Sequence, residues 1–286
     1  MDKQKRIAVI HDLSGVGKCS LTVALPVISA SGVECACLPT ALLSTHTGGF
    51  SDYTFKDLSD EMLPIAKHWK AEGIEFDGIY SGYLASAKQE EMLEEIIEIL
   101  ASKDTKIIVD PVMADNGRYY SNLGYDMCLA FRRLCEKAHV ITPNITEAAL
   151  LTDLPYKEGP HEQEYMDCLI DGLSKLCKGI IAITGVRPDE DNVGVYAVNT
   201  QTREKCLCVR PAKEGVFCGT GDIFASAFAS LTLRGVNLKD AVDAAISLVS
   251  ESIERTVKRA TPRRNGVDFE AALPRYIKRV SELCGE

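Results

Sequence analysis

The sequence lacks the features that mark membrane, secreted and nucleic-acid-binding proteins. No apolar run approaches the roughly 18 residues that a membrane-spanning helix needs, and residues 1–9 contain no signal-peptide core. Basic residues are fewer than acidic ones, 32 against 41, and the resulting net charge of −9 argues against general nucleic-acid binding. The five basic residues between Arg255 and Arg264 are interpreted as a solvated helix end. We therefore expect a cytoplasmic protein that binds neither nucleic acid nor membranes.

Zinc-ligand spacing is also lacking, although the chain has eleven cysteines. In the two Cys-x-Cys pairs, strand alternation puts both thiols on one face, and no histidine or further cysteine stands nearby at zinc spacing. We therefore expect most cysteines to be small buried side chains in a reducing compartment. The cysteines that support this interpretation lie in apparent core segments: Cys128, Cys135, Cys168 and Cys177.

Apolar runs alternate with amphipathic segments along the 286 residues. The runs typical of buried parallel strands are 7–10, 78–80, 106–109, 140–142 and 180–184. Residues 193–198 and 206–209 predict an antiparallel hairpin, and the chain is expected to end in helices over 221–234, 238–259 and 268–283. No linker or repeat interrupts this pattern. The sequence therefore predicts a single α/β domain, residues 1–286, with a mainly parallel sheet covered by helices on both faces.

Polar residues follow several of the predicted strands. They are Asp12, the Ser81–Tyr83 segment, the Asp110–Asp115 segment, the Thr142–Glu147 segment and the Thr184-Gly185 pair. Each has an ordinary structural explanation by itself, as a cap or a turn. Ligands of open parallel sheets bind at the carboxyl ends of the strands, so together these residues predict a binding site there.

The segment "HDLSGVGKCSL", residues 11–21, resembles a phosphate-binding P-loop only superficially. A P-loop requires glycine five positions before Gly17 and a hydroxyl residue after Lys18, but Asp12 and Cys19 stand there. An acidic side chain would repel phosphate, and a thiol is a poor Mg²⁺ ligand. We therefore do not expect Lys18 to bind ATP phosphates.

The strongest site signal is "GTGD", residues 219–222, before an apolar helix that Gly235 can end. Glycines at a helix start expose backbone N–H groups that bind anions together with the helix dipole. Asp222 in the first turn either complements the dipole or acts as a general base beside the anion site. Cys218 adjoins this loop, and the N–H groups predict a lowered thiol pKa and sensitivity to thiol reagents that ATP would relieve. Burial beside Phe217 is the alternative interpretation.

Five segments together identify a family resemblance. The "GTGD" segment near the end of a chain of this length is similar to the signature of the ribokinase-like superfamily. Within it, "LLSTHTGGF" (42–50), "SGYLAS" (81–86), "DPVMAD" (110–115) and "TPNITEA" (142–148) resemble motifs of the pyridoxal kinases, which phosphorylate vitamin B6. The opening "DLSGVG" also resembles the substrate loop of hydroxymethylpyrimidine kinases, with Asp12 where many pyridoxal kinases have serine. The resemblance spans residues 7 to about 235.

This resemblance implies a ribokinase-like three-layer sandwich that transfers the γ-phosphoryl group of ATP to the 5′-hydroxymethyl group of pyridoxal, pyridoxine or pyridoxamine. It implies Mg²⁺ and a monovalent cation as cofactors and a homodimer as the assembly. The opening loop would then face the vitamin and the 219–222 loop the ATP. The implied catalytic residues are Gly219, Thr220, Gly221 and Asp222. The implied vitamin-binding residues are Asp12, His46, Thr47 and Tyr83. The implied nucleotide-binding residues are Asp115, Asn144, Thr184, Thr220 and Gly221, with 116–120 as a cover, and the implied metal ligands are Asp110 and Glu147.

Two alternatives stay open. A hydroxymethylpyrimidine or sugar kinase of the same superfamily would share the motifs. A non-catalytic B6-binding regulatory protein would share the fold, although the intact glycine loop and Asp222 argue against it. His11 and His46 are as consistent with ordinary loop histidines as with a functional role.

Overall fold

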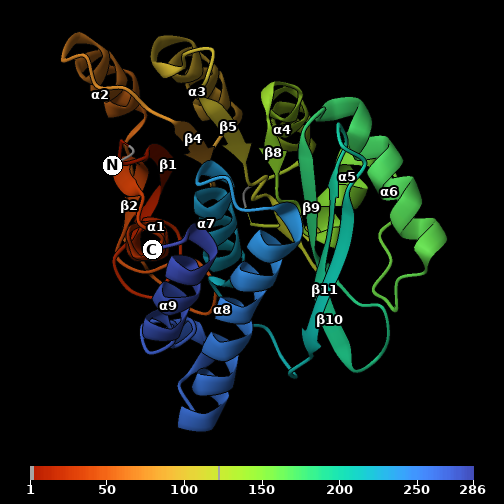
Figure 1. Ribbon diagram of the computed structural model, residues 1–286. Coiled ribbons are helices and arrows are strands. Elements are labelled where there is room, and N and C mark those ends of the chain that lie inside the picture. The colour runs from red at the N-terminus through yellow and green to blue at the C-terminus, as the bar shows by residue number, and fades with distance from the viewer. Residues whose placement is uncertain (1–2, 122) are drawn as a thin grey trace.

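The computed structural model describes residues 3–121 and 123–286, whose main feature is one nine-stranded sheet (Figure 1). Its strands are β1 (Arg6–Ser14), β2 (Glu34–Leu43), β3 (Phe55–Asp57), β4 (Gly78–Ser81), β5 (Lys106–Val109), β8 (Val140–Ile141), β9 (Ile180–Val186), β10 (Asn192–Asn199) and β11 (Lys205–Pro211). The order across the sheet is β11-β10-β9-β8-β5-β4-β1-β2-β3. The strands from β9 to β2 pair in parallel, and antiparallel pairs occur at both edges. A separate small hairpin consists of β6 (Ala114–Asp115) and β7 (Arg118–Tyr119).

Helices cover both faces of the sheet (Figure 1). One face carries α2 (Ser59–Ala71), α3 (Ala87–Leu100), α4 (Tyr125–Lys137), α5 (Ile145–Thr152) and α6 (Gln163–Leu176). The other carries α1 (Leu21–Ala30), α7 (Thr220–Leu233), α8 (Leu238–Arg259) and α9 (Leu273–Cys284). None of these helices is both long and apolar enough to span a bilayer within the described residues. The predicted three-layer α/β architecture is confirmed.

Strand alternation divides the interior into two cores. In β1, Ala8 and Ile10 point into the core beneath α2–α6, whereas Ile7 and Val9 point into the core beneath α1 and α7–α9. All four side chains are fully buried, as expected for a central parallel strand with helices on both sides. The sheet is therefore held from both faces by apolar burial, which fixes the position of its strand ends.

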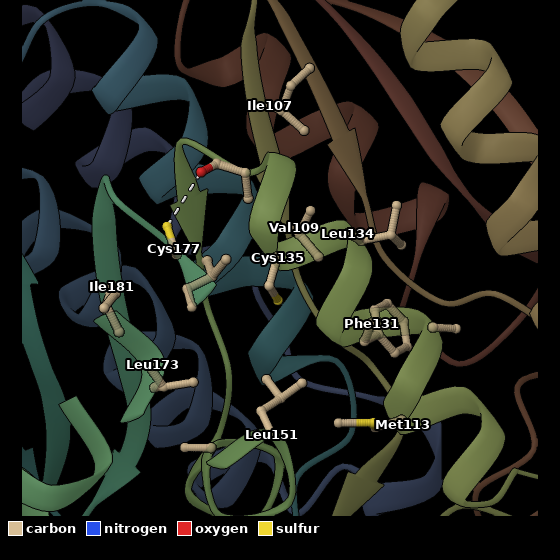
Figure 2. Close-up of a cluster of buried hydrophobic side chains, with 14 of the residues drawn as sticks. Ile107, Val109, Met113, Phe131, Leu134, Cys135, Leu151, Leu173, Cys177 and Ile181 are labelled. Atoms are coloured by element: carbon tan, nitrogen blue, oxygen red, sulfur yellow. Dashed lines mark hydrogen bonds between the residues drawn. The ribbon is translucent and has the colours of Figure 1, made fainter. Parts of the chain in front are cut away.

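The first core shows how the cysteines are used (Figure 2). Cys135 and Cys177 are buried among aliphatic side chains, and the Cys177 thiol donates a hydrogen bond to the Ala138 carbonyl over 3.4 Å. Cys128 is buried as predicted, but the prediction for Cys168 was wrong, because that residue is exposed. The α6 helix buries the opposite stripe, which includes Leu169 and Leu173, and leaves Cys168 on the solvent side.

The first strand is longer than the apolar run that predicts it. After a bulge between His11 and Leu13, β1 continues to pair with Leu42 and Leu43 of β2, so Asp12 lies within the strand and not in a loop. The β2 strand itself is not evident from the sequence because it contains Pro39. Since β3 pairs only with residues 41–43, the β2 backbone around Pro39 is a sheet edge, where proline is tolerated.

Candidate functional site

The polar residues predicted to form a site do gather at one edge of the sheet. The strands β1, β4, β5 and β8 are parallel, so their carboxyl ends, with Asp12, Ser81, Asp110 and Thr142, lie side by side. Asn144 continues the row through an isolated parallel bridge to Thr184 on β9. The edge is therefore a row of polar groups from five neighbouring strands, as the sequence predicts.

The glycine loop forms the N-terminus of α7 at this edge. Gly219 caps the helix in the left-handed conformation, with φ of 79°. A Cβ atom at Gly219 would lie 2.1 Å from the Lys18 carbonyl oxygen, so only glycine allows this close approach to the opening segment. Apart from the neighbouring residues and the backbone of α7 itself, no atom of the described residues lies within 4 Å of a Cβ atom placed on Gly221, which leaves open space over the first turn. Helix N–H groups beside open space form an anion-binding position.

Asp222 is held by residues from the other end of the chain. The backbone N–H of Ser20 donates to its Oδ2 over 2.9 Å, and Nε2 of His11 lies 3.0 Å from its Oδ1. The side chain is 12% exposed, so one edge of the carboxylate still reaches the open side of the site. Both oxygens are oriented, which a residue that merely complements the helix dipole does not require.

His11 is completely enclosed between two carboxylates. Burial lowers the pKa of His11, but hydrogen bonding and charge interaction with Asp12 and Asp222 outweigh burial and raise it to about 10. Its Nδ1 lies 3.1 Å from Asp12 Oδ1 and also faces the backbone N–H groups of Asp12 and Tyr83, at 3.0 and 3.3 Å. With this pKa the ring is charged at neutral pH and carries a proton on each nitrogen, whereas in a neutral ring the N–H groups that point at Nδ1 leave the single proton on Nε2.

Asp12 also makes most of its contacts within the protein. Its carboxylate accepts hydrogen bonds from Ser20 Oγ over 2.6 Å and from Ser14 Oγ over 2.8 Å. Burial raises the pKa of Asp12, but the hydrogen bonds from His11, Ser20 and Ser14 have the larger effect and lower it. Ser20 adopts φ of 56° and ψ of −135°, a strained conformation for a residue with a Cβ atom, at a typical cost of about 1–3 kcal/mol. Its two bonds, to Asp12 and Asp222, maintain this strained backbone.

Asp110 and Glu147 form a second carboxylate pair. Burial and the charge of Asp222 raise the pKa of Asp110 to about 7. The hydrogen bond from Thr142 Oγ1, 2.9 Å long, lowers this pKa but only partly offsets the rise. Burial and the charge of Asp110 raise the pKa of Glu147. Glu147 Oε2 accepts from the Asn144 N–H and Oε1 accepts from the Met113 N–H, at 2.9 and 3.1 Å. Glu147 thus closes a capping box at the start of α5, and no hydrogen-bond donor among residues 3–121 and 123–286 reaches the second carboxylate oxygen of Asp110.

The donors around Asp110 fit Mg²⁺ better than a metal with an all-protein cage. Mg²⁺ binds oxygen, commonly through one or two carboxylates together with water and phosphate oxygens. Burial and the charge of Asp222 raise the pKa of Asp110, and burial and the charge of Asp110 raise that of Glu147, so a cation beside these carboxylates would relieve unfavourable negative charge. In the parts of the chain that the structure describes, no three His, Cys, Asp or Glu side chains converge as a complete metal site.

Several polar groups of the predicted nucleotide-binding residues have hydrogen-bond partners within the protein. The Asn144 amide donates to the Ala114 carbonyl over 2.8 Å and its oxygen caps α5, while Thr220 Oγ1 donates to the Phe217 carbonyl over 3.1 Å. Burial raises the pKa of Asp115, at the turn of the small β6–β7 hairpin. These side chains are therefore positioned by the protein before any ligand arrives.

The predicted vitamin side is formed by the opening segment and residues 46–50. His46 donates from Nε2 to the Arg264 carbonyl over 2.7 Å and accepts the Gly48 N–H at Nδ1, so both ring nitrogens have protein partners. Thr47 is exposed beside it. Tyr83 is half-buried, and burial together with the charge of Asp12 raises the pKa of its hydroxyl.

Lys18 points away from the anion loop. Its ammonium group pairs with Asp268 and Glu270, at 3.2 and 2.9 Å. Asp268 is buried and also accepts from Thr261 Oγ1 over 2.9 Å. The lysine therefore ties the opening segment to the chain that follows α8, in agreement with the prediction that it is not a P-loop lysine.

The prediction for the Cys218 pKa was wrong. Burial raises the pKa of this thiol, and the carboxylates of Asp115 and Asp222 raise it further. The sequence indicated only the N–H groups of the following helix, which stabilise a thiolate, whereas the fold adds two negative charges that destabilise it.

A pocket of about 310 Å³ lies between the anion loop and the end of α8. Phe217 contributes an aromatic ring to its wall, with the Arg263 guanidinium 4.9 Å from the ring centroid. Val257, on α8, is 51% exposed at the same pocket. The pocket thus has an aromatic ring and an aliphatic side chain beside polar groups, close in sequence to the 219–222 loop.

The sequence left the role of His11 open and placed Tyr120 only within the predicted cover segment, residues 116–120. His11 reaches Asp222 across 211 positions, and no local pattern signals such a pair. Tyr120 follows the β6–β7 hairpin and is 40% exposed, and partial burial together with the charges of Glu147 and Asp115 raises its pKa. Its place at the end of the predicted cover segment was the sequence signal for it.

Comparison with known proteins identifies the family. A family model described as phosphomethylpyrimidine kinase matches residues 23–265. The crystal structure of a putative phosphomethylpyrimidine kinase from Bacteroides thetaiotaomicron, with pyridoxal, is 37% identical, with a TM-score of 0.91 over 96% of each chain. Pyridoxal kinase from Lactobacillus plantarum is 31% identical, with a TM-score of 0.88 over 98% of this chain and 99% of that one. A putative pyridoxal kinase of Schizosaccharomyces pombe is 26% identical over 99% of this chain and 93% of its own. The ribokinase-like fold and the resemblance to pyridoxal kinases are thereby confirmed, and the chain belongs to the phosphomethylpyrimidine kinase family.

Proposed function

We propose that the protein transfers the γ-phosphoryl group of ATP to the 5′-hydroxymethyl group of a B6 vitamer: pyridoxal, pyridoxine or pyridoxamine. The observation that carries the proposal is the oriented Asp222 carboxylate in the first turn of α7, beside the open space over Gly221. The similarity to pyridoxal kinases and to a structure that holds pyridoxal supports the choice of substrate class.

In the proposed reaction Asp222 accepts the proton of the vitamer hydroxyl as its oxygen attacks the γ-phosphorus. The new O–P bond forms while the bond from the γ-phosphorus to the bridging oxygen breaks, and ADP leaves with that electron pair. The N–H groups of Gly219, Thr220, Gly221 and Asp222 are aimed at the charge that develops on the transferred group. Positioning and electrostatic stabilisation are the two contributions this chain makes to the step.

Asp110, with Glu147 behind it, would hold Mg²⁺ directly or through water. When bound, the ion neutralises charge on the ATP phosphates. The chain's own residues orient the two carboxylates, through Thr142 and through the capping box of α5. Asp115, Asn144 and Thr184 would contact phosphates, and residues 116–120 would cover the nucleotide. A monovalent cation is included in the proposal and is tested by exchange of K⁺ for a larger organic cation in the assay.

The pocket beside Phe217 suits the base of ATP. A flat ring would bury the exposed face of Val257 and lie near the Phe217 ring, next to the loop that binds the phosphates. On the other side of Asp222, the vitamer ring would lie against Asp12, Thr47 and Tyr83, with His46 behind them.

The proposal is tested by coupled measurement of ADP release with each B6 vitamer and with hydroxymethylpyrimidine or a sugar as the acceptor. We expect the largest kcat/KM with a B6 vitamer. A larger value with hydroxymethylpyrimidine would favour the second candidate, which the family description and the "DLSGVG" opening support. Vitamer binding without ADP release under any condition would instead indicate the non-catalytic regulatory function.

The remaining proposals concern the protein as a whole. We propose that residues 1–286 act as one kinase domain in the cytoplasm, where a reducing environment suits a chain with eleven thiols. We also propose a homodimer, supported by the exposed side chains of Leu13, Leu42 and Phe55 at one end of the sheet. Sedimentation equilibrium at micromolar concentration would test the assembly, and a monomer there would contradict it.

A further inference from the structure

The imidazole of His11 occupies a slot that allows it one position. A Cβ atom on Gly82 would lie 2.1 Å from Cδ2 and 2.2 Å from Nε2 of this ring, so the absence of a side chain at Gly82 makes room for it. The Tyr80 ring meets it edge-on, with 6.4 Å between the centroids and 83° between the planes. Only 1% of His11 is exposed, which leaves no alternative rotamer with access to solvent.

The hydrogen bonds around the ring determine whether Nε2, the nitrogen that faces Asp222, carries a proton. The backbone N–H groups of Asp12 and Tyr83 point at Nδ1, so a neutral ring has its proton on Nε2. A charged ring has protons on both nitrogens. In either state an N–H group is directed at Asp222 Oδ1, 3.0 Å away. The contact therefore does not depend on the protonation state of His11.

We propose that His11 is a positioning residue for the kinase reaction: its Nε2–H and the Ser20 N–H each hold one oxygen of Asp222, so that the carboxylate presents a fixed lone pair to the substrate hydroxyl. The inference rests on the proposed function. His11 is only 1% exposed, so it offers almost no surface to a substrate. Its contribution is orientation, since a catalytic side chain without fixed partners occupies several rotamers of which few are productive.

The first test compares kinetic constants of His11→Ala and His11→Gln with those of the parent. Loss of the N–H should lower kcat by roughly 10²-fold in His11→Ala, the typical effect of a small misplacement of a reacting group. The KM values for ATP and vitamer should stay within about threefold, because the lost interaction does not bind either substrate. The amide of glutamine can place an N–H near the position of Nε2, so His11→Gln should recover most of kcat.

A matched control is available in His161. This histidine is also buried and also uses both ring nitrogens, toward the Lys157 carbonyl and the Arg187 N–H, at 3.1 and 2.9 Å. His161→Ala removes a buried, doubly bonded imidazole without contact to Asp222, so it should lower stability and leave kcat unchanged. Equal kcat losses in His161→Ala and His11→Ala would overturn the proposal, because both would then reflect general destabilisation.

The slot provides a second, independent test through a double-mutant cycle. Gly82→Ala should displace the His11 ring and lower kcat much as His11→Ala does. In the His11→Ala background the same substitution meets no ring, so it should cause little further loss. Additive losses would show that Gly82 acts separately from His11 and would contradict the inferred mechanism.

A measurement on the resting protein, without any kinase reaction, separates the positioning role of His11 from the proposed function. The ¹⁵N resonances of His11 in the resting protein should show a proton on Nε2, and Asp222→Ala should shift that resonance. A proton on Nδ1 alone would overturn the positioning role even in an active kinase. A parent protein that releases no ADP with any acceptor, yet shows this Nε2 proton, would refute the kinase function and leave the His11–Asp222 contact established.

Discussion

At the residue scale, the site depends on how the environment changes the chemistry of common side chains. Asp222, Asp110 and Asp12 are all aspartates within one region, yet burial and neighbouring charge raise the pKa of Asp110 to about 7 while hydrogen bonds lower that of Asp12. Asp222 differs from both because its two oxygens are oriented by single N–H donors and it retains access to the open side of the site. The environments of single side chains lead to predictions for Asp222, Lys18 and Cys218.

Asp222→Asn should lower kcat by about 10²–10⁴-fold, the usual contribution of a positioned base. The side-chain oxygen of asparagine can still accept from one of the two donors, His11 or Ser20, and the side chain keeps its size, so the KM for the vitamer should change little. Steady-state kinetics with each vitamer measure both constants. Retention of near-parental kcat would exclude Asp222 as the base.

Lys18→Ala should change the KM for ATP by less than about tenfold, which corresponds to about 1.4 kcal/mol. The reason is that the ammonium group pairs with Asp268 and Glu270 and not with the anion loop. Asp12→Ala is the comparison: it should raise the KM for the vitamer and not that for ATP. A large rise in the KM for ATP in Lys18→Ala would reverse the placement of the two ligands.

Cys218 should react slowly with iodoacetamide at pH 7, because burial and two carboxylates raise its pKa and reduce the thiolate fraction. The rate should increase as the pH rises toward the raised pKa. Mass spectrometry of the modified peptides gives the rate for each cysteine, with exposed Cys168 as the reference in the same sample. Cys218→Ser should be active. Fast alkylation of Cys218 at pH 7 that ATP prevents would show that the thiol is reactive, as the sequence predicts, and would contradict the raised pKa.

At the scale of elements, helix ends and helix pairs place the catalytic groups. The α7 N-terminus can approach the opening segment only because Gly219 has no side chain and adopts a left-handed φ. The start of α5 is fixed by the capping box between Asn144 and Glu147, which also fixes one carboxylate of the metal-binding pair. The α3 and α4 helices, on the opposite face of the sheet from α7, are joined by an ion pair between Glu90 and Arg133.

Arg133→Ala should destabilise the fold by about 1–3 kcal/mol, because the Glu90 carboxylate is fully buried and would lose its partner. Burial already raises the pKa of Glu90 above its ordinary value. A carboxyl with a raised folded pKa contributes most to stability below its unfolded pKa, and this contribution is lost as the pH rises through the folded pKa. The destabilisation should therefore be small near pH 4 and larger at pH 7, as urea unfolding at both values would show. In the Glu90→Gln background Arg133→Ala should cost less, and an equal cost there would indicate that packing, not charge, is responsible.

At the scale of the whole molecule, the site joins segments from both ends of the chain. The opening segment, the residues after α8 and the glycine loop meet around Asp222, Lys18 and Asp268, so ligands bound there bridge parts that separate on unfolding. The net charge of −9 does not attract anionic ATP at long range, and the local N–H groups and Mg²⁺ must supply that attraction.

Bound ligands should therefore raise the melting temperature. ATP with Mg²⁺ at about 100 times its Kd should add about 2.7 kcal/mol to the free energy of unfolding, and a vitamer should add a separate increment. Differential scanning fluorimetry at fixed protein concentration measures both. ATP without Mg²⁺ is the control and should stabilise less, whereas equal stabilisation with and without Mg²⁺ would contradict the assignment of Asp110 to the metal.

The sequence by itself determined the architecture and the order of the site segments along the chain. Apolar runs such as 7–10 and 106–109 are local patterns with the period of buried strands, and polar residues directly after them must lie at the carboxyl edge of a parallel sheet. The glycine loop before α7 likewise signals an anion site through local backbone geometry alone. The long β2 strand could not be predicted from the sequence because it contains Pro39. Proline is acceptable only at the edge of a sheet, and the position of a strand within the sheet is not visible in its own sequence.

Only the tertiary structure decided which side chains meet and what charge they carry. The His11–Asp222 contact spans 211 positions and depends on the space over Gly82, neither of which a local pattern contains. The pKa of Cys218 depends on Asp115 and Asp222, which add to burial and oppose the helix N-terminus that the sequence made visible. Electrostatic effects sum over all neighbours in space, so they become known only when the chain is folded.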